Sequence, residues 1–588
     1  NKPLCVYMGL AGQHAFNSDR HHFFMLQGAR AAARELSERG IALNVYLPDD
    51  PTHRVLPNLV RQAACSVFEI MPVKPFNRWQ PQLAGTAQGP VLAVDARCIV
   101  PMTLSRKAPT RAFAFRDKFA DEYSRRIATG EFQESPLTSG NYPPVSFEPL
   151  ALAELDDAAL LDRIATLAID HSIGPVADTP GGSIAGYRRW QTFLERGLKS
   201  YHRRRNNANE RWPLGVSRMS AYLHHGHVSP WRIARSAADT SGGGSEKFLD
   251  ELTVWRELAH HWCWHTEDPD SLAALPEWAR ETLKAHALDP RPARYSLRTL
   301  QHGRTNEPLW NLAQRSLLIH GELHNNLRMT WAKAIPGWCA DPEQALATLL
   351  DLNHRYALDG NDPASYGGLL WALGLFDRPF NPPQPVLGAV RGRSLQGHAA
   401  RLDVAAYADH VGRTQGQRLR VAVVGAGVAG MAAAGILARA NHDVSVFEKS
   451  RGPGGRVATR RRETLRFDHG AQYLTAKDPR LARHLDSWLA DGQIESWPQR
   501  VVRGRPGLWR SEEPYARWRG APGMNAVARA QAEDLPVTTE TRVTALMQGQ
   551  SGWIVCTDDQ AGPSEQTFDA ILLAIPAPQA AALLEPVH

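Results

Sequence analysis

The sequence predicts a multidomain protein in which an α/β domain, an all-α domain and a second α/β domain follow one another along the chain. Three observations predict this order. Apolar runs alternate with helical patterns at the start, helical periodicity without strands fills the middle, and a glycine-rich turn separates two apolar runs near the end. At 588 residues the chain is several times the size of one domain, so one fold cannot account for it.

The first part of the chain, residues 1–135, is predicted to be an α/β domain. Its apolar runs are LCVYM, ALNVYL, SVFEIM and VLAVDA, and helical patterns lie near residues 20–39 and 55–64. Strands that alternate with helices pair in parallel and carry the helices on their faces. Residues 136–180 begin with a run rich in Pro, Ser, Gly and Asn and are interpreted as a connector.

Residues 181–380 are predicted to be all-α. Helical periodicity is sustained over long segments such as residues 246–265 and 342–356, and strand-like alternation is absent. The same region holds most of the 17 tryptophans of the chain, which is more than core packing usually requires. A functional use for some of these rings is therefore expected.

A third domain is predicted over residues 419–588, after an arginine-rich linker at residues 381–418. The segment LRVAVVGAGVAGMAAAGILARANHDVSVFEKS has the pattern of a strand, a glycine-rich turn, a helix and a second strand that ends in an acid. We expect the three glycines to form the turn, admit a pyrophosphate and let the helix pack closely, while the acid accepts from ribose hydroxyls. This pattern predicts a site for FAD or NAD(P) at Gly425, Gly427, Gly430 and Glu448.

The composition is that of a soluble globular protein, because 43% of the residues are hydrophobic and 22% are charged. No apolar run reaches the roughly 18 to 20 residues that span a bilayer, and the start lacks a signal pattern, so a cytoplasmic protein is expected. The net charge of +7 mildly favours polyanion partners. Six scattered cysteines, and the histidine clusters at residues 224–227 and 260–265, match no zinc signature, so we expect no metal.

Seven segments of the helical region occur in the same order as in one known family. They are YHRRRN, SRMSAYLHHGHVSP, FLDELTVWRELAHHWCW, EWARETL, RTNEPLWNLAQ, HNNLRMTWAK and LNHRYALDGNDPASYGGLLW. On these segments the chain resembles the class II DNA photolyases of the photolyase and cryptochrome superfamily. The resemblance implies a helical FAD-binding domain at residues 181–380 and a Rossmann-like antenna domain at residues 1–135, whose chromophore the sequence does not identify.

The resemblance also implies where FAD lies. Arg328 and Asp359 are expected to bring an ion pair to the edge of the isoalloxazine ring. Asn353 is expected to face N5, where a neutral amide can hydrogen-bond the ring without adding charge. Gly360 is expected to permit close approach of the backbone to the ring. The other implied ligands are an aromatic residue and two short hydroxyl residues before a helix that suit phosphate oxygens: Tyr201, Ser217 and Ser220.

On the substrate side the resemblance implies four residues. Glu251 and Trp255 are four positions apart, so a helix projects them from one face. In the family the carboxyl group hydrogen-bonds a pyrimidine dimer, and a protonated carboxyl could donate to a developing pyrimidine anion. Aromatic planes grip the flipped bases, and we assign this role to Trp255 and Trp371, with Met329 beside them.

Trp310, Trp331 and Trp338 match the electron relay through which the family reduces its flavin. The last two are seven positions apart, which is about 10 Å along a regular helix. Pro336 and Gly337 stand between them and disfavour a continuous helix.

The C-terminal part resembles the FAD-binding half of renalase-like, amine-oxidase-like flavoproteins through EKSRGPGGRVATRR, FDHGAQYL, APGMN and ILLAIPAPQA. The resemblance places Gly455 and Arg456 near flavin phosphates. We interpret residues 419–588 as the first half of such a domain, and a second FAD or an NAD(P) is the expected cofactor.

The main functional prediction is light-dependent repair of cyclobutane pyrimidine dimers in damaged DNA by electron transfer from reduced FAD, in a monomer. Arg203, Arg204 and Arg205 could contact DNA phosphates, although a solvated face is nearly as consistent with the sequence. Two alternatives stay open. One is a cryptochrome-like flavin photoreceptor without repair, and the other is an amine or NAD(P)H oxidoreductase that acts through the C-terminal domain.

Overall fold

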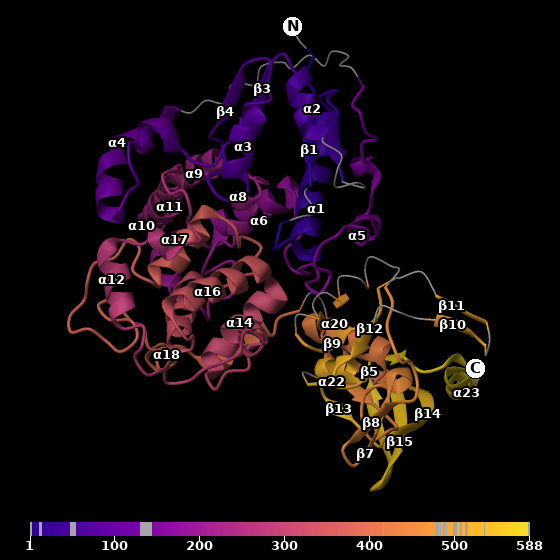
Figure 1. Cartoon of the computed structure of the whole chain (residues 1–588). Coiled ribbons are helices and arrows are strands. Elements are labelled where there is room, and N and C mark those ends of the chain that lie inside the picture. The colour runs from indigo at the N-terminus through magenta and orange to yellow at the C-terminus, as the bar shows by residue number, and fades with distance from the viewer. Residues whose placement is uncertain are drawn as a thin grey trace. The chain divides into compact units, whose positions relative to one another are not determined.

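The computed structural model divides the chain into two compact units (Figure 1). The first comprises residues 1–169 and 173–411, and the second comprises residues 170–172 and 412–588. The structure describes residues 3–10, 14–47, 55–129, 144–414, 417–476, 481, 484–485, 488–489, 491–497, 502–505, 508–511, 516–533 and 535–585. Within these ranges no helix is both long enough and apolar enough to cross a membrane.

The N-terminal part of the first unit has the predicted βα alternation. The strands β1 (Val6–Gly9) and β2 (Leu43–Tyr46) pair in parallel, and so do β3 (Ser66–Glu69) and β4 (Val91–Val94). The helices α1 (Asp19–Ser37), α2 (Val55–Gln62) and α3 (Phe76–Ala84) alternate with them. The strand segments were therefore predicted correctly, although they form two separate pairs.

The connector assigned to residues 136–180 is folded where the structure describes it. A 3₁₀ turn, η2 (Leu152–Glu154), and the helix α5 (Asp157–Ile164) lie in this segment and pack on α1. Leu152, Leu160 and Ile164 are buried in one cluster with residues of α1 and β2. The interpretation as a mere connector is wrong for these residues, because their apolar side chains complete the core of the α/β part. Residues 136–143 lie outside the described residues.

The middle of the first unit is helical, as predicted, and no strand occurs among its described residues between 144 and 411. Two of its helices begin with the same dipeptide, Asp-Pro. Asp341 accepts from the Gln344 amide at the start of α16 (Pro342–Tyr356), and Asp362 accepts from the Ala364 amide at the start of α17 (Pro363–Trp371). An aspartate N-cap followed by proline at the first helical position is a strong helix start.

The remaining helices of this region are short to medium in length. They include α6 (Ser183–Arg196), α7 (Tyr201–Arg204), α8 (Ser220–His224), α9 (Pro230–Ala238), α12 (Glu277–Ala285), α13 (Leu297–Gln301), α14 (Pro308–His320) and α15 (Asn325–Ala334). Before them lies α4 (Ala112–Thr129).

The single helix predicted over residues 246–265 consists of three pieces. An α-helix, α10 (Gly243–Leu249), passes into a π-helix, η4 (Asp250–Arg256), and then into α11 (Glu257–Trp264). π-Helical turns are rare and frequently mark functional sites. Hydrophobic periodicity could not reveal the change of winding, because apolar residues line all three pieces.

The linker assigned to residues 381–418 is wrong up to Val411. This segment forms α18 (Leu395–Ala399) and α19 (Val404–Val411), and both belong to the first unit. Leu387, Val390 and Tyr407 are buried in the same core cluster as Trp310 and Trp331. Its arginines favour a linker, but the apolar residues between them pack on the helical core.

One arginine joins the α/β part of the first unit to its helical part. Arg20, at the start of α1, is buried and donates to the carbonyl groups of Gly174, Leu317, Leu318 and Tyr356. The last three lie at the C-terminal ends of α14 and α16, whose final carbonyls have no partner within their own helices. A positive charge also suits a helix C-terminus.

The second unit contains the predicted strand, turn, helix and strand. The strands β5 (Arg420–Val424), β6 (Asp443–Phe447), β13 (Val537–Thr538) and β17 (Ala570–Leu573) form one parallel sheet in the order β13-β6-β5-β17. The helix α20 (Val428–Arg439) connects β5 to β6.

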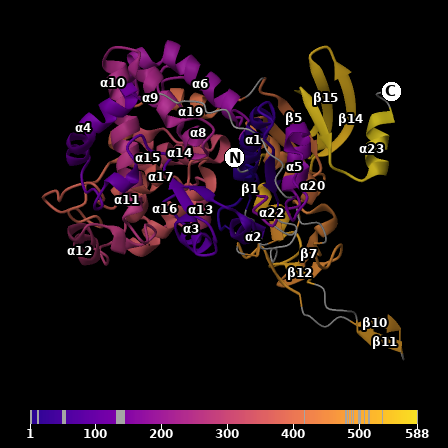
Figure 2. The same cartoon turned by 90° about the horizontal axis from the view of Figure 1, so that it is seen from above.

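Smaller elements complete the second unit. An antiparallel sheet of β14 (Arg542–Gly549), β15 (Gly552–Asp559) and β16 (Gly562–Phe568) precedes β17, and α23 (Ala577–Leu584) lies beside β14 (Figure 2). The other elements are β7 (Thr459–Arg462), β8 (Leu465–Asp468), β9 (Ile494–Ser496), β10 (Val502–Arg505), β11 (Leu508–Ser511), β12 (Trp518–Gly520) and α22 (Ala526–Ala532).

Candidate active site

Most of the residues predicted around FAD and its substrate lie on five elements that are in contact in the first unit. These elements are α7, the π-helix η4, α15, α16 and α17, with the loop at residues 357–362 between the last two. Direct contacts link η4 to α17, α15 to α17, and α16 to α17. The Asn326 side chain at the start of α15 also donates to the Asn206 carbonyl just after α7. Segments that are more than a hundred residues apart in sequence therefore meet at one place.

Arg328 and Asp359 form the predicted ion pair. Nη2 of Arg328 lies 3.2 Å from Oδ1 of Asp359, and both residues are buried. Nη1 of Arg328 donates to the Ser365 hydroxyl, which donates in turn to the Asp359 carbonyl. The pair thus holds α15 against the loop at residues 357–362 and the start of α17. A buried ion pair is retained only where such further hydrogen bonds satisfy its atoms.

Asn353 is fully buried near the end of α16 and keeps one acceptor free. Its side-chain amide donates to the Gly360 carbonyl over 3.0 Å. Its Oδ1 has no hydrogen-bond partner among the described residues. Because a buried unpartnered polar atom is costly, this oxygen is suited to accept from a ligand N–H. The amide thus fits a ring nitrogen that carries a proton.

Gly360 packs tightly against the end of α16, and its role beside a flavin stays a prediction. A β-carbon there would lie 2.6 Å from the α-carbon of His354 and 2.7 Å from the Asn353 carbonyl oxygen. The space on the β-carbon side of Gly360 is filled by the end of α16. Glycine is required at this position because the loop returns so closely to the helix that precedes it.

Glu251 lies on η4 and is paired with two cations. Its Oε1 is 2.9 Å from Nη2 of Arg205 and 2.7 Å from Nζ of Lys247. Both neighbours are proton donors that orient the Glu251 carboxyl group, and its side chain is 18% exposed. The proton donation expected of Glu251 concerns a bound substrate and stays a prediction.

Tyr201 and Trp255 flank this cluster from two elements. Tyr201 begins α7 and is buried among Phe193 and Phe248, whose rings it meets edge on. Burial raises the pKa of Tyr201, and the charge of Glu251 adds to the rise. Trp255 lies one turn beyond Glu251 and is 43% exposed, so a large aromatic surface is available to a ligand there.

Met329 and Trp371 are brought together by the packing of α15 on α17. Gly368 on α17 leaves room for the Met329 methyl group, which lies 3.4 Å from where a Gly368 β-carbon would be. One turn further along each helix, Nζ of Lys333 donates to the Trp371 carbonyl over 3.0 Å and lies 4.3 Å from the Trp371 ring centroid. Both predicted substrate residues therefore lie on one helix interface.

The three relay tryptophans form a continuous set of rings. Trp331 and Trp310 are stacked, with ring centroids 5.9 Å apart and planes inclined by 7°. Trp310 meets Trp338 edge on at 5.2 Å. Two of the N–H groups have neutral acceptors, since Trp310 donates to the Trp331 carbonyl and Trp331 donates to Gln314.

The order of these rings differs from the path expected along one helix. Trp310 lies between Trp331 and Trp338 in the set. The helix α15 ends at Ala334, and a 3₁₀ turn at Ile335–Gly337, η6, contains the predicted breakers Pro336 and Gly337. Trp338 follows this turn and packs against Trp310 and Tyr295.

Ser217 and Ser220 lie at the start of α8, but not as caps. Ser220 is the first residue of this five-residue helix and is exposed, Met219 occupies the N-cap position, and Ser217 is partly exposed. Arg218 between them has a positive φ of 55° and pairs with Asp178 and Glu322. The loop is thus held by Arg218, and the two hydroxyl groups remain candidates for phosphate contacts.

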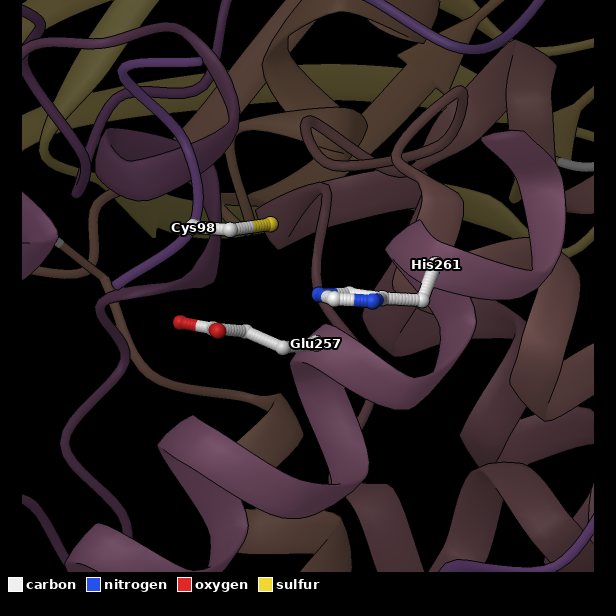
Figure 3. Close-up of side chains that lie close together, drawn as sticks. All are labelled: Cys98, Glu257 and His261. Atoms are coloured by element: carbon white, nitrogen blue, oxygen red, sulfur yellow. The ribbon is translucent and has the colours of Figure 1, made fainter. Parts of the chain in front are cut away.

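His261 has an acidic and a cysteine neighbour that the sequence spacing did not reveal. Potential ligand atoms of Cys98, Glu257 and His261 lie within 4.8 Å of one another (Figure 3). Both His261 nitrogens already contact the chain, at the Ser105 hydroxyl and the Val100 carbonyl. The Glu257 carboxyl accepts from the amides of Ile99 and Val100 and from the Tyr123 hydroxyl. These contacts anchor the loop after β4 on α11, and the absence of metal stays a prediction.

The glycine-rich turn of the second unit is built as the motif predicted. Gly425 has a φ of +104°, and a β-carbon on Gly430 would lie 2.0 Å from the Gly425 carbonyl oxygen. At Gly427 the nearest heavy atom to a β-carbon is 4.0 Å away, on Gly455. Space for a phosphate is therefore left at Gly427, while the other two glycines serve the fold.

Glu448 and the second glycine pair lie at the same turn. The Glu448 carboxylate accepts from the amides of Ala426 and Ser450 over 2.9 and 2.8 Å. These bonds orient the acid, and its oxygens retain lone pairs for further donors. Gly454 donates to the Ala426 carbonyl, Gly455 has a φ of +55°, and Arg456 after it is exposed. Gly455 and Arg456 thus lie beside the predicted pyrophosphate position.

Comparison with known proteins gives the family. The chain is 31% identical over 411 residues to the deoxyribodipyrimidine photo-lyase of Methanothermobacter thermautotrophicus. This alignment covers 70% of this chain and 88% of that protein. It is 34% identical over 411 residues to the enzyme of the same name from Oryza sativa subsp. japonica, covering 67% of this chain and 78% of the relative. The chain therefore belongs to the deoxyribodipyrimidine photo-lyase family of enzymes.

Two further comparisons concern the fold. A crystal structure of a bacterial class III photolyase from Agrobacterium tumefaciens aligns with a TM-score of 0.53 at 16% identity, over 70% of this chain and 81% of that one. The photolyase-like fold of the first unit agrees with the prediction. Residues 423–488 match the model of the NAD(P)-binding Rossmann-like domain, which confirms the fold predicted for the start of the second unit.

Sequence reasoning missed two side chains of the site. Arg205 was treated only as part of a basic run, and Lys333 was not considered. The sequence signal for Arg205 was weak because Arg203 and Arg204 precede it, whereas only Arg205 turns toward Glu251. Lys333 is 3% exposed, and a lysine in a sequence is seldom a sign of such burial.

Glu257 generates a prediction about pH. Burial raises the pKa of this carboxyl from its usual 4.5 to about 8, although hydrogen bonds to Ile99, Tyr123 and Val100 oppose the rise. The folded state therefore holds the Glu257 proton more tightly than the unfolded state. Its stabilising contribution is complete below about pH 4.5 and is lost as the pH rises through 8.

We expect the free energy of unfolding of the wild type, relative to Glu257→Gln, to fall between pH 5 and 8 by up to about 1.4 kcal/mol per pH unit. Urea denaturation of both proteins at several pH values measures this difference. Other titrating groups are shared and cancel in the subtraction. Parallel stability curves for the two proteins would contradict the assignment.

Proposed function

We propose that the first unit repairs cyclobutane pyrimidine dimers in DNA by light-driven electron transfer from reduced FAD. Membership of the photolyase family supports this proposal, and the assignment to class II rests on the sequence segments given above. The observation that carries it is the buried Asn353, with its unpartnered Oδ1, next to the Arg328–Asp359 ion pair. A buried acceptor beside a fixed charge pair suits a polar ring edge such as that of a flavin.

The residues of the first unit would hold FAD in the following way. Arg328 and Asp359 would bind the polar edge of the ring. The Oδ1 atom of Asn353 would accept a hydrogen bond from a ring nitrogen that carries a proton. Ser217 and Ser220 would contact phosphate oxygens, and Tyr201 would support the cofactor from α7. When bound and reduced, FAD supplies an electron on absorbing light.

One group of substrate residues would bind the dimer through charge and hydrogen bonds, and another would bind it by stacking. The Glu251 carboxylate, oriented by Arg205 and Lys247, would accept from a pyrimidine N–H, while the two cations would stabilise negative charge on a pyrimidine carbonyl. Trp255 and Trp371 would stack on the flipped bases, and Met329 would fill the space between them. A flavin photoreceptor without repair is the main alternative, and the exposed Trp255 beside a charged cluster favours repair.

A repair assay tests this proposal. Reduced protein under blue light, given an oligonucleotide with a single thymine dimer, should restore the two thymines. Glu251→Ala should lower the repair rate by about tenfold or more because it removes the oriented carboxylate. FAD content should stay unchanged. The measurement is loss of the dimer by chromatography.

Glu210→Ala is the matched control, since Glu210 pairs with Arg204 on the surface of the same region. It should leave repair unaltered. A flavin photocycle with unchanged DNA would favour the photoreceptor. Full repair by Glu251→Ala would remove Glu251 from the mechanism.

The ring order predicts which tryptophan interrupts the relay. Trp310 lies between Trp331 and Trp338, so Trp310→Phe should slow light-driven reduction of oxidised flavin by about an order of magnitude. Absorbance at 450 nm under blue light measures this rate. Repair by chemically reduced protein should remain normal, because it does not use the relay. Equal photoreduction in variant and wild type would exclude Trp310 from the path.

A second candidate function concerns the second unit, because Gly427 leaves open space at the glycine-rich turn. We propose that this turn binds the pyrophosphate of a second FAD or of NAD(P), with Glu448 on the ribose. This would serve an amine or NAD(P)H oxidoreductase activity. An acid at that position disfavours a 2′-phosphate, so NAD is preferred to NADP.

Gly427→Val places a branched side chain where the pyrophosphate would approach, without a clash in the fold. We expect it to weaken binding of the dinucleotide by at least about tenfold, with the free energy of unfolding nearly unchanged. Isothermal titration of the full chain with NADH, NADPH and FAD measures this. Gly435→Val, on the same helix but away from the turn, is the control. Unaltered binding in Gly427→Val would place the ligand elsewhere.

A further inference from the structure

Lys333 is a buried lysine whose Nζ contacts one residue in two ways. It donates to the Trp371 carbonyl over 3.0 Å and lies 4.3 Å from the centroid of the Trp371 ring. Lys333 is 3% exposed, and burial lowers its pKa to about 7. A lysine is rarely retained in such a place unless its contacts compensate the loss of water.

The first contact lies at a helix end. Trp371 is the last residue of α17, and its carbonyl accepts from the Gly374 amide as well as from Lys333. The second contact fixes the indole, because a cation over the face of a tryptophan ring is attracted by the ring quadrupole. Together the two contacts fix both the backbone and the ring of Trp371. A helix cap alone would need only the first.

The position of Lys333 on α15 connects this arrangement to the rest of the site. Met329 lies four positions before Lys333 and therefore on the same face of the helix. Met329 packs at Gly368 while Lys333 holds Trp371, so the α15–α17 interface carries both predicted substrate residues. Arg328, on the same helix, is fixed by Asp359. The orientation of α15 therefore sets the positions of Arg328, which is proposed to bind the flavin edge, and of Lys333, which contacts Trp371.

We propose that Lys333 is a positioning residue for substrate recognition, which holds the Trp371 ring in the orientation that stacks on a flipped base. This inference rests on the proposed function. Lys333 acts through Trp371 and does not itself touch the substrate.

The experiment is a double-mutant cycle on the full chain. Binding of a labelled duplex with one thymine dimer, and of the same duplex undamaged, is measured by fluorescence anisotropy for wild type, Lys333→Met, Trp371→Ala and the double variant. Lys333→Met should lower the preference for the damaged duplex about tenfold. In the Trp371→Ala background it should cause no further loss. FAD content and affinity for undamaged DNA should be unchanged.

Two further variants serve as a control and as a second test. Lys284→Met, at an exposed position on α12, should behave as wild type. Lys333→Gln keeps a hydrogen-bond donor without the charge, and it is carried through the same cycle if Lys333→Met does not retain FAD. An unchanged preference in the Lys333 variant, or an equal loss in both Trp371 backgrounds, would overturn the inference, since a purely structural residue gives the second result.

An independent measurement separates this inference from the proposed function. With 5-fluorotryptophan incorporated, the fluorine resonance of Trp371, assigned with Trp371→Phe, should shift or broaden in Lys333→Met without DNA. An unchanged resonance would overturn the inference even if the wild type repairs DNA. A wild type that neither prefers nor repairs damaged DNA would instead contradict the proposed function.

Discussion

The buried ion pair between Arg328 and Asp359 is the interaction on which the site depends. It costs free energy to bury two charges, and the pair is retained with a further hydrogen bond to Ser365 that satisfies the guanidinium. Its position matters more than its strength. It fixes α15 to the loop at residues 357–362, and that loop also fixes Asn353 through Gly360. Met329, Trp331 and Lys333 also lie on α15. By fixing this helix, the charge pair sets the positions of the proposed flavin ligand Arg328, of the relay residue Trp331 and of the substrate residue Met329.

Irregular backbone places the other functional side chains. Glu251 and Trp255 lie on the π-helix η4, on which Leu252, Thr253 and Val254 are buried and Trp255 is exposed. Pro336 and Gly337 end α15 and turn the chain so that Trp338 folds back on Trp310. In both cases a break in regular hydrogen bonding brings a side chain to a position that a continuous helix could not reach.

Much of the fold and part of the site could be predicted from the sequence. The βα alternation, the all-α middle and the glycine-rich turn follow from local patterns, and local patterns were enough to place them. The pairing of Arg328 with Asp359 came from resemblance to the family, and the structure contains it. The roles expected of Gly360 and of a protonated Glu251 concern a bound flavin and a bound substrate and stay predictions, whereas the neighbours of both residues became known only from the fold. His354 fills the space beside Gly360, and Arg205, directly after α7, pairs with Glu251 on η4.

The two sets of tryptophans around the site differ in their electrostatic surroundings. The hydrogen-bond partners of Trp310 and Trp331 are a backbone carbonyl and a neutral amide, whereas Trp371 lies against the ammonium of Lys333. When Lys333 is protonated, its positive charge close to the indole makes removal of an electron from that ring less favourable, most of all where little water screens the charge. The stacked rings are therefore suited to pass electrons, and the ring held by Lys333 is suited to stack without being oxidised. One fold can keep these roles apart because α15 directs Trp331 into the helical core and Lys333 toward α17.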